Sequence, residues 1–181
     1  MDKKMWVIVL AVVLVAAGAY IFFGTQKKAV APMVAAFDPT NATYIIDGQP
    51  AALVDGKAQV AAAPGSAEQV TTSIFGEPAS GDLNGDGRPD AAMILVQDSG
   101  GSGIFYYVAA AINTTGGAEG SNAILLGDRI APQNIEIQNG QIVVNYADRN
   151  PGEPMATAPS VGVTKYFIYQ SSTLQSIAAG K

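Results

Sequence analysis

Short apolar runs separated by tight-turn dipeptides constrain the fold of this 181-residue chain more than any other feature of its sequence. Asp-Gly pairs at 47–48 and 55–56 separate the runs "ATYII", "QPAALV" and "KAQVAAA", and an Asn-Gly pair at 139–140 separates "NIEIQ" from "QIVVNY". Such pairs suit two-residue hairpin loops, because both residues of a type I′ turn need a positive φ. The sequence therefore predicts antiparallel hairpins after residue 41.

Other apolar runs fit strands of the same kind. "TTSIF" precedes and "AAMILV" follows an acidic loop, "IFYYVAAAI" follows a glycine-rich turn, and "TKYFIYQ" supplies a last strand. No segment after residue 30 has a convincing helical period, and the sequence has no obvious fixed-length repeat. We therefore expect residues 41–181 to form one mainly β domain, an antiparallel sandwich or an open barrel.

The first forty residues differ in character from this body. Residues 5–23, "MWVIVLAVVLVAAGAYIFF", carry no charge and are bracketed by lysine pairs, with aromatic residues near both ends. A helix of this length spans about 28 Å, close to the hydrocarbon thickness of a bilayer. We expect residues 1–24 to be a transmembrane anchor and residues 25–40 a tether. The alternative is a signal peptide cleaved after the small residues 17–19.

Charge is unevenly distributed along the chain. Residues 1–28 carry four lysines and one aspartate, whereas the remaining residues carry six basic and fourteen acidic side chains, a net charge of −8. An acidic body without a basic cluster argues against a nucleic-acid partner. The glycine-rich turn "DSGGSG" lacks the Lys-Ser/Thr ending of a phosphate loop, which argues against a nucleotide. We expect a single-pass protein of the cytoplasmic membrane with its body outside the cytoplasm, or a secreted body after cleavage.

Cysteine and histidine are both absent. Their absence removes disulfides, thiolate ligands, thiol nucleophiles and the commonest general base. A metal bound to this chain must therefore be a hard cation held by oxygen, such as calcium or magnesium.

The stretch "GDLNGDGRPD" at residues 81–90 has oxygen-bearing side chains in a calcium-loop register. The candidate calcium ligands, at positions one, three, five, seven and nine, are the side chains of Asp82, Asn84, Asp86 and Asp90 and the backbone carbonyl of Arg88. Gly87 at position six permits the sharp turn. Position twelve is Met93 where an EF-hand has glutamate, so the loop runs into a strand, and we expect a weak site with a dissociation constant of ~10⁻⁴–10⁻³ M. Magnesium, or a solvated turn without metal, is the alternative.

The segment "IFGEPASGDLNGDGRPDAAMIL" resembles the FG-GAP type of calcium-loop repeat, with a Phe75-Gly76 pair, the acidic core and a following apolar strand. The resemblance implies calcium binding by Asp82, Asn84, Asp86 and Asp90 and the Arg88 carbonyl. The family builds propellers of at least four blades, and this chain has one copy over about twenty residues, so the propeller does not carry over.

A wider resemblance rests on "NATYIIDG", "GDLNGDG", "GGSGIFYYVAAAINT", "NAILLGDRIAPQ", "VNYADRNPGEPM" and "PSVGVTKYF". These segments are similar to an uncharacterised domain of bacterial envelope proteins and lipoproteins. That similarity implies an extracytoplasmic bacterial setting and no particular activity. We expect a binding or structural protein whose partner is an envelope protein or polymer.

An alternative function is an envelope hydrolase acting on glycan or peptide. Without histidine it would need a carboxylate pair, from Asp128, Asp148 or Glu153, or a serine activated by Lys165. The repeated pairs Asp128-Arg129 and Asp148-Arg149 fit either such a site or a structural clamp between neighbouring loops.

Overall fold

The structure, a computed structural model, describes residues 36–63, 65–101 and 103–178. This part of the chain contains a 3₁₀ turn, η1 (Pro39–Asn41), and twelve strands: β1 (Thr43–Ile46), β2 (Gln49–Ala52), β3 (Lys57–Ala61), β4 (Gln69–Gly81), β5 (Asp90–Asp98), β6 (Ile104–Thr114), β7 (Gly117–Gly120), β8 (Ile124–Asp128), β9 (Ala131–Gln138), β10 (Gln141–Asp148), β11 (Val161–Gln170) and β12 (Thr173–Ile177). The anchor expected at residues 1–24 and most of the tether lie outside the described residues. Within them, no helix is long and apolar enough to cross a membrane.

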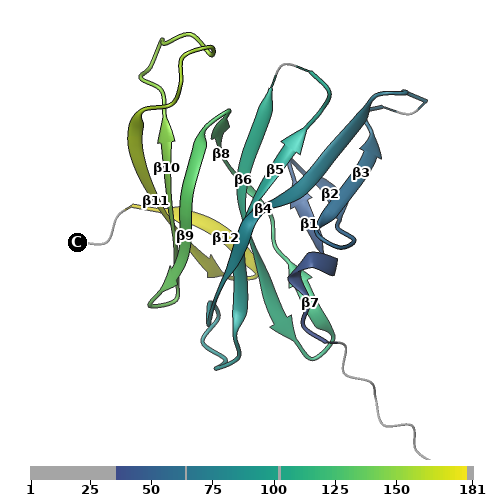
Figure 1. The fold of residues 1–181 in the computed structure, drawn as a ribbon. Helices are drawn as coiled ribbons and strands as arrows, with labels where there is room; N and C mark the ends of the chain where they lie inside the picture. The colour runs from purple at the N-terminus through teal and green to yellow at the C-terminus, as the bar shows by residue number, and fades with distance from the viewer. Residues whose placement is uncertain (1–35, 64, 102, 179–181) are drawn as a thin grey trace, which may run out of the picture. The chain divides into compact units, whose positions relative to one another are not determined.

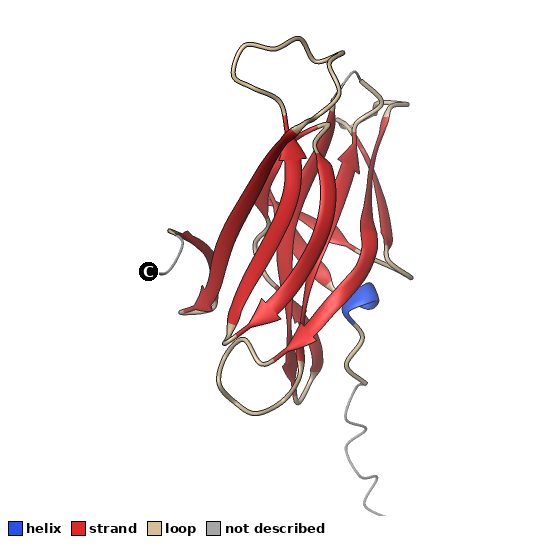
Figure 2. Cartoon of the chain, turned by 60° about the vertical axis from the view of Figure 1, so that its left-hand side comes forward, coloured by secondary structure: helices blue, strands red, loops and turns tan. Residues whose placement is uncertain are grey.

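The strands form three antiparallel sheets (Figures 1 and 2). The largest has the order β3-β4-β5-β6-β7, with β8 also paired to β6; the second has the order β12-β11-β10-β9, and the third is the β1–β2 hairpin. The expectation of a mainly β, antiparallel domain is confirmed for the described residues.

The two central strands of the largest sheet, β5 and β6, are buried on both faces. They pair in register from Ala91↔Ala111 to Asp98↔Ile104, so successive side chains point to opposite faces. Their even-numbered residues face the four-stranded sheet and their odd-numbered residues face the β1–β2 hairpin. This explains why "AAMILV" and "IFYYVAAAI" read as continuous apolar runs, because residues 90–95 of β5 and 107–112 of β6 are buried on both faces.

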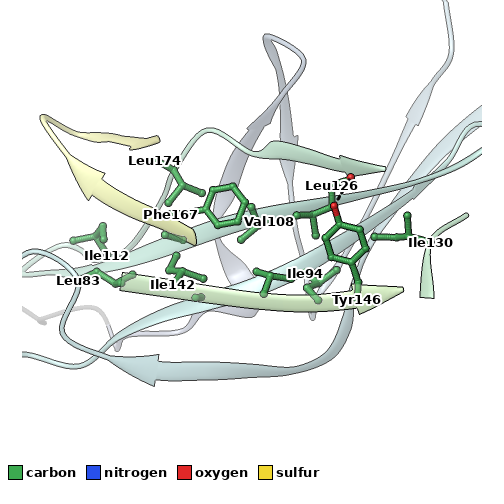
Figure 3. Packing of buried hydrophobic residues seen from close by; sticks show 13 residues of the cluster. Leu83, Ile94, Val108, Ile112, Leu126, Ile130, Ile142, Tyr146, Phe167 and Leu174 are labelled. Carbon is green, nitrogen blue, oxygen red and sulfur yellow. Dashed lines mark hydrogen bonds between the residues drawn. The ribbon is translucent and has the colours of Figure 1, made fainter. Parts of the chain in front are cut away.

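The first core lies between the two large sheets (Figure 3). Its buried side chains include Ile94 and Val108 from the six-stranded sheet and Ile142 and Phe167 from the four-stranded sheet. Tyr146 is also buried here, and its hydroxyl donates to the Leu126 carbonyl at 3.2 Å. The hydroxyl therefore enters the core with a partner, as a buried phenol requires.

The second core lies under the β1–β2 hairpin on the opposite face of the six-stranded sheet. Tyr44 and Ile46 of β1 pack there with Met93 and Leu95 of β5. The Ile45 backbone bonds to the segment after β7, with its N–H donating to Ser121 and its carbonyl accepting from Ala123. The hairpin is thus attached by hydrogen bonds as well as by apolar packing.

The dipeptide turns adopt the backbone conformation that the sequence predicts. Asp47-Gly48 joins β1 to β2 with φ values of 50° and 79°, and Asn139-Gly140 joins β9 to β10 with φ values of 51° and 74°. Asp55-Gly56 also has two positive φ values and leads into β3. Each pair supplies the left-handed residues that these turns need.

Candidate metal centre in the acidic loop

The acidic loop connects β4 to β5, and the pairing of Gly81 with Asp90 closes its base. The loop winds around the carboxylate of Asp82. Its Oδ1 accepts from the N–H groups of Asn84 and Gly85 at 3.2 and 2.7 Å, and its Oδ2 accepts from the Gly87 N–H at 2.8 Å. These donors, Gly87 foremost, lower the pKa of Asp82, so the carboxylate is ionised at neutral pH.

Asp86 is the second ionised carboxylate, and it faces the guanidinium of Arg88. Its Oδ2 lies 2.6 Å from Arg88 Nη2 and also accepts from Asn84 Nδ2 at 3.0 Å. Its Oδ1 accepts from the Arg88 N–H at 2.8 Å. The side-chain bond with Arg88, followed by that backbone bond, lowers the pKa of Asp86 to about 2. The loop therefore carries its own positive partner for this acid.

Asp90 is fully buried and holds the loop against the sheet. Its Oδ2 accepts from the Leu83 N–H at 2.9 Å, and its Oδ1 accepts from the Asn113 N–H of β6 at 2.8 Å. Asn113 Nδ2 also donates to the Pro89 carbonyl at 3.1 Å. Asp90 therefore ties the start of the loop, its end and a neighbouring strand together.

The donor chemistry of the loop suits a hard cation, since three carboxylates and an amide oxygen lie within nine residues. Their arrangement is a different matter. In the described part of the chain, no group of three or more acidic side chains lies close enough together to hold a metal ion. Asp82, Asn84, Asp86 and Arg88 are linked by hydrogen bonds, whereas Asp90 points to Leu83 and Asn113. Metal binding would require Asp86 to exchange the Arg88 guanidinium for the cation.

Sequence reasoning did not find the role of Asn113. This residue follows the acidic loop by more than twenty positions and fits a β-strand end or a glycosylation sequon equally well. Only the register of β5 against β6, with Ala91 opposite Ala111, places its N–H beside Asp90.

The two Asp-Arg pairs come together around Arg149. Its Nη1 donates to the Arg129 carbonyl at 3.0 Å and reaches the Asp128 carbonyl at 3.5 Å, and its Nε donates to the Thr157 carbonyl. Arg149 therefore links the β8–β9 turn to the proline-rich loop at 149–160. These contacts support the interpretation of the pairs as a structural clamp between neighbouring loops.

The carboxylates considered for hydrolysis are engaged in local contacts. Asp128 binds Arg129 at 2.9 Å and accepts from the Ile104 N–H at 2.9 Å; the Arg129 bond is the main cause of its lowered pKa. Asp148 accepts from the Arg149 N–H, and Glu153 accepts from the N–H and the side-chain amide of Asn150. Asp148 and Glu153 thereby stabilise their own turns, whereas Asp128 also ties the end of β8 to the start of β6.

Comparison with known proteins finds no matching family model, curated protein or solved structure. The assignment of a function to this chain therefore depends on its own residues and geometry.

Proposed function

We propose that this chain is a membrane-anchored extracytoplasmic protein whose body is an antiparallel β-sandwich carrying a calcium-binding loop, and that it serves as a binding or structural protein of the bacterial envelope. The observation that carries the calcium proposal is the loop at 82–90. It concentrates ionised carboxylates in an exposed turn that is already wound around Asp82 and fixed to the core by Asp90. The anchor and the setting are supported by residues 5–23 and by the acidic body.

In this proposal the cation lies among Asp82, Asn84, Asp86, the Arg88 carbonyl and Asp90. Calcium would supply the positive charge that offsets the repulsion between these acids. Asp82 and Asp86 are already ionised, so calcium need not displace protons from them at neutral pH. Asp90 keeps its hydrogen bond to the Asn113 N–H of β6. Calcium binding therefore makes the start of β5 more rigid.

The proposal is tested by thermal unfolding of the full chain, purified from detergent-solubilised membranes, in calcium and in chelator. At a calcium concentration 100-fold above the dissociation constant, we expect stabilisation of about 2.7 kcal/mol, which raises the melting temperature by roughly 5–10 °C. Recovery of a shortened chain from the soluble extracytoplasmic fraction would instead support signal-peptide cleavage.

Variants assign the calcium effect to the loop. Asp82→Asn and Asp86→Asn should abolish the stabilisation, whereas Asp55→Asn, in a different exposed turn, should keep it. Arg88→Ala retains the carbonyl and removes the guanidinium that occupies Asp86, so it should bind calcium several-fold more tightly. Equal melting temperatures of the parent in calcium and in chelator would refute the calcium proposal, and an equal response to magnesium would refute selectivity.

A further inference from the structure

Strand β4 of the six-stranded sheet and the edge strand β9 of the four-stranded sheet contact each other, and both carry a bulge (Figure 1). In β4 the register passes from Phe75↔Ile94 to Ala79↔Ala92, so the three residues 76–78 lie opposite Met93 alone, and Gly76 has a φ of 69°. In β9 the register against β10 is shifted at Gln133. Bulges bend a strand and redirect its side chains.

Two adjoining hollows occupy this side, and we call them together the β4–β9 groove. One, of about 210 Å³, lies between the bulges and is lined by Phe75, Glu77, Ile94, Pro132 and Gln133 among others. The second, of about 370 Å³, is lined by residues that include Ser73, Phe75, Asp98, Ile104 and Tyr106. Phe75 lines both hollows, so they adjoin at its side chain.

The floor of the groove is aromatic and open to solvent. Phe75 is 41% exposed, and its ring meets Tyr106 edge to face, with centroids 5.6 Å apart and planes at 82°. Ile104 is also exposed, at 37%. Exposed apolar side chains grouped in a hollow make a candidate ligand site, because their burial by a ligand is favourable.

The polar lining is acidic or neutral. Glu77 and Asp98 supply carboxylates, Ser73 a hydroxyl, and Gln133 an amide. No lysine or arginine is among the lining residues of these two hollows. Within the described part of the chain, the side chains of Glu77, Ser73 and Gln133 make no hydrogen bond. Their polar groups can therefore form hydrogen bonds with a ligand. An anionic ligand such as a nucleotide or a phosphopeptide would face two carboxylates without a counter-charge.

We propose that the β4–β9 groove binds an uncharged oligosaccharide. Sugar rings present an apolar C–H face, which packs on aromatic rings, and a rim of hydroxyls, which donate to carboxylates and exchange hydrogen bonds with amides and hydroxyls. The groove offers these two surfaces together, and its open side admits a chain of sugars. The proposal names the ligand for the binding role proposed above and rests on that role, but it does not depend on the calcium loop.

The test is isothermal titration of the full chain in detergent with cellotetraose, chitotetraose and maltotetraose. We expect at least one of these to bind, and Phe75→Ala to weaken it by about three- to tenfold. Leu125→Ala is the matched control, because Leu125 is 48% exposed and its partner Tyr107 places it on the other face of the same sheet. Glu77→Gln, an exposed change that keeps the size of the side chain, provides a second test if Phe75→Ala fails to fold.

Two outcomes would overturn the proposal: no binding of any of the three sugars, or binding that neither Phe75→Ala nor Glu77→Gln weakens. A final titration in chelator separates this proposal from the calcium proposal. Sugar binding that persists in chelator supports the groove, whatever the calcium response of the loop.

Discussion

Asp90 shows how one residue can serve a purpose that its sequence pattern does not reveal. The spacing from Asp82 predicts it as a metal ligand, yet both carboxylate oxygens accept backbone N–H groups in a fully buried position. Asx turns explain the neighbouring Asp82, Asn84 and Asp86 from local sequence alone, since their acceptors are filled within five residues. The bonds of Asp90 join segments 7 and 23 residues away, and a local pattern cannot encode them.

Asp90→Asn should lower the free energy of unfolding in chelator by about 1–3 kcal/mol, because the amide replaces one acceptor with a donor and leaves a buried N–H without a partner. Chemical denaturation measures the loss, with exposed Asp55→Asn as the control. Equal stability of the Asp90→Asn variant and the parent would contradict the bracing role.

At the scale of elements, the turn dipeptides were predictable and the shortest strands were not. Asn139-Gly140 sets the β9–β10 hairpin through its own backbone preference. By contrast, "GAEG" at 117–120 has no strand propensity, and it becomes β7 because the end of β6 offers it partners. The β4 bulge at residues 76–78 likewise depends on the strands that flank β4. The sequence alone does not identify those strands.

The clamp at Arg149 belongs to this scale, since it joins two loops through three carbonyls. Arg149→Lys should loosen the loop at 149–160, because an ammonium group does not reproduce the planar fork of the guanidinium. Hydrogen-exchange mass spectrometry should then show faster exchange in that loop and in the β8–β9 turn. Arg129→Lys, which changes a partly exposed ion pair, should have a smaller effect. Unchanged exchange in Arg149→Lys would exclude the clamp.

For the whole molecule, the sequence predicted a mainly antiparallel β domain but not its layers. Continuous apolar runs in β5 and β6 indicate burial on both faces, and the structure shows that one face is covered by the four-stranded sheet and the other by the β1–β2 hairpin. Which sheet covers which face depends on contacts between residues far apart in the sequence. Hairpin turns and apolar runs do not specify such contacts.

The free energy of unfolding at high pH depends on two tyrosines in the core under the β1–β2 hairpin. Burial is the main cause of the raised pKa of Tyr44 and of Tyr107, whose hydroxyl donates to Asp47 at 2.8 Å. Above the ordinary tyrosine pKa of 10.0, these phenols ionise in the unfolded chain but stay neutral in the folded one. The free energy of unfolding is therefore maintained below pH 10 and should fall above it, by about 1.4 kcal/mol per pH unit for each tyrosine.

Denaturant unfolding at pH 8, 10 and 11 checks this decline, and Tyr107→Phe should reduce its slope. An identical slope in the variant and the parent would show that Tyr107 does not contribute to it.

The position of the β1–β2 hairpin in the chain has a consequence for the order of folding. Residues 43–52 leave the ribosome before β5 and β6, but their core is completed by side chains of those two strands, up to Ala111. Until those strands have been made and paired, Tyr44 and Ile46 have no surface on which to pack, and a two-stranded hairpin alone is only marginally stable. The earliest-synthesised strands of this domain must therefore wait for later ones, and we expect the hairpin to be the last layer to dock.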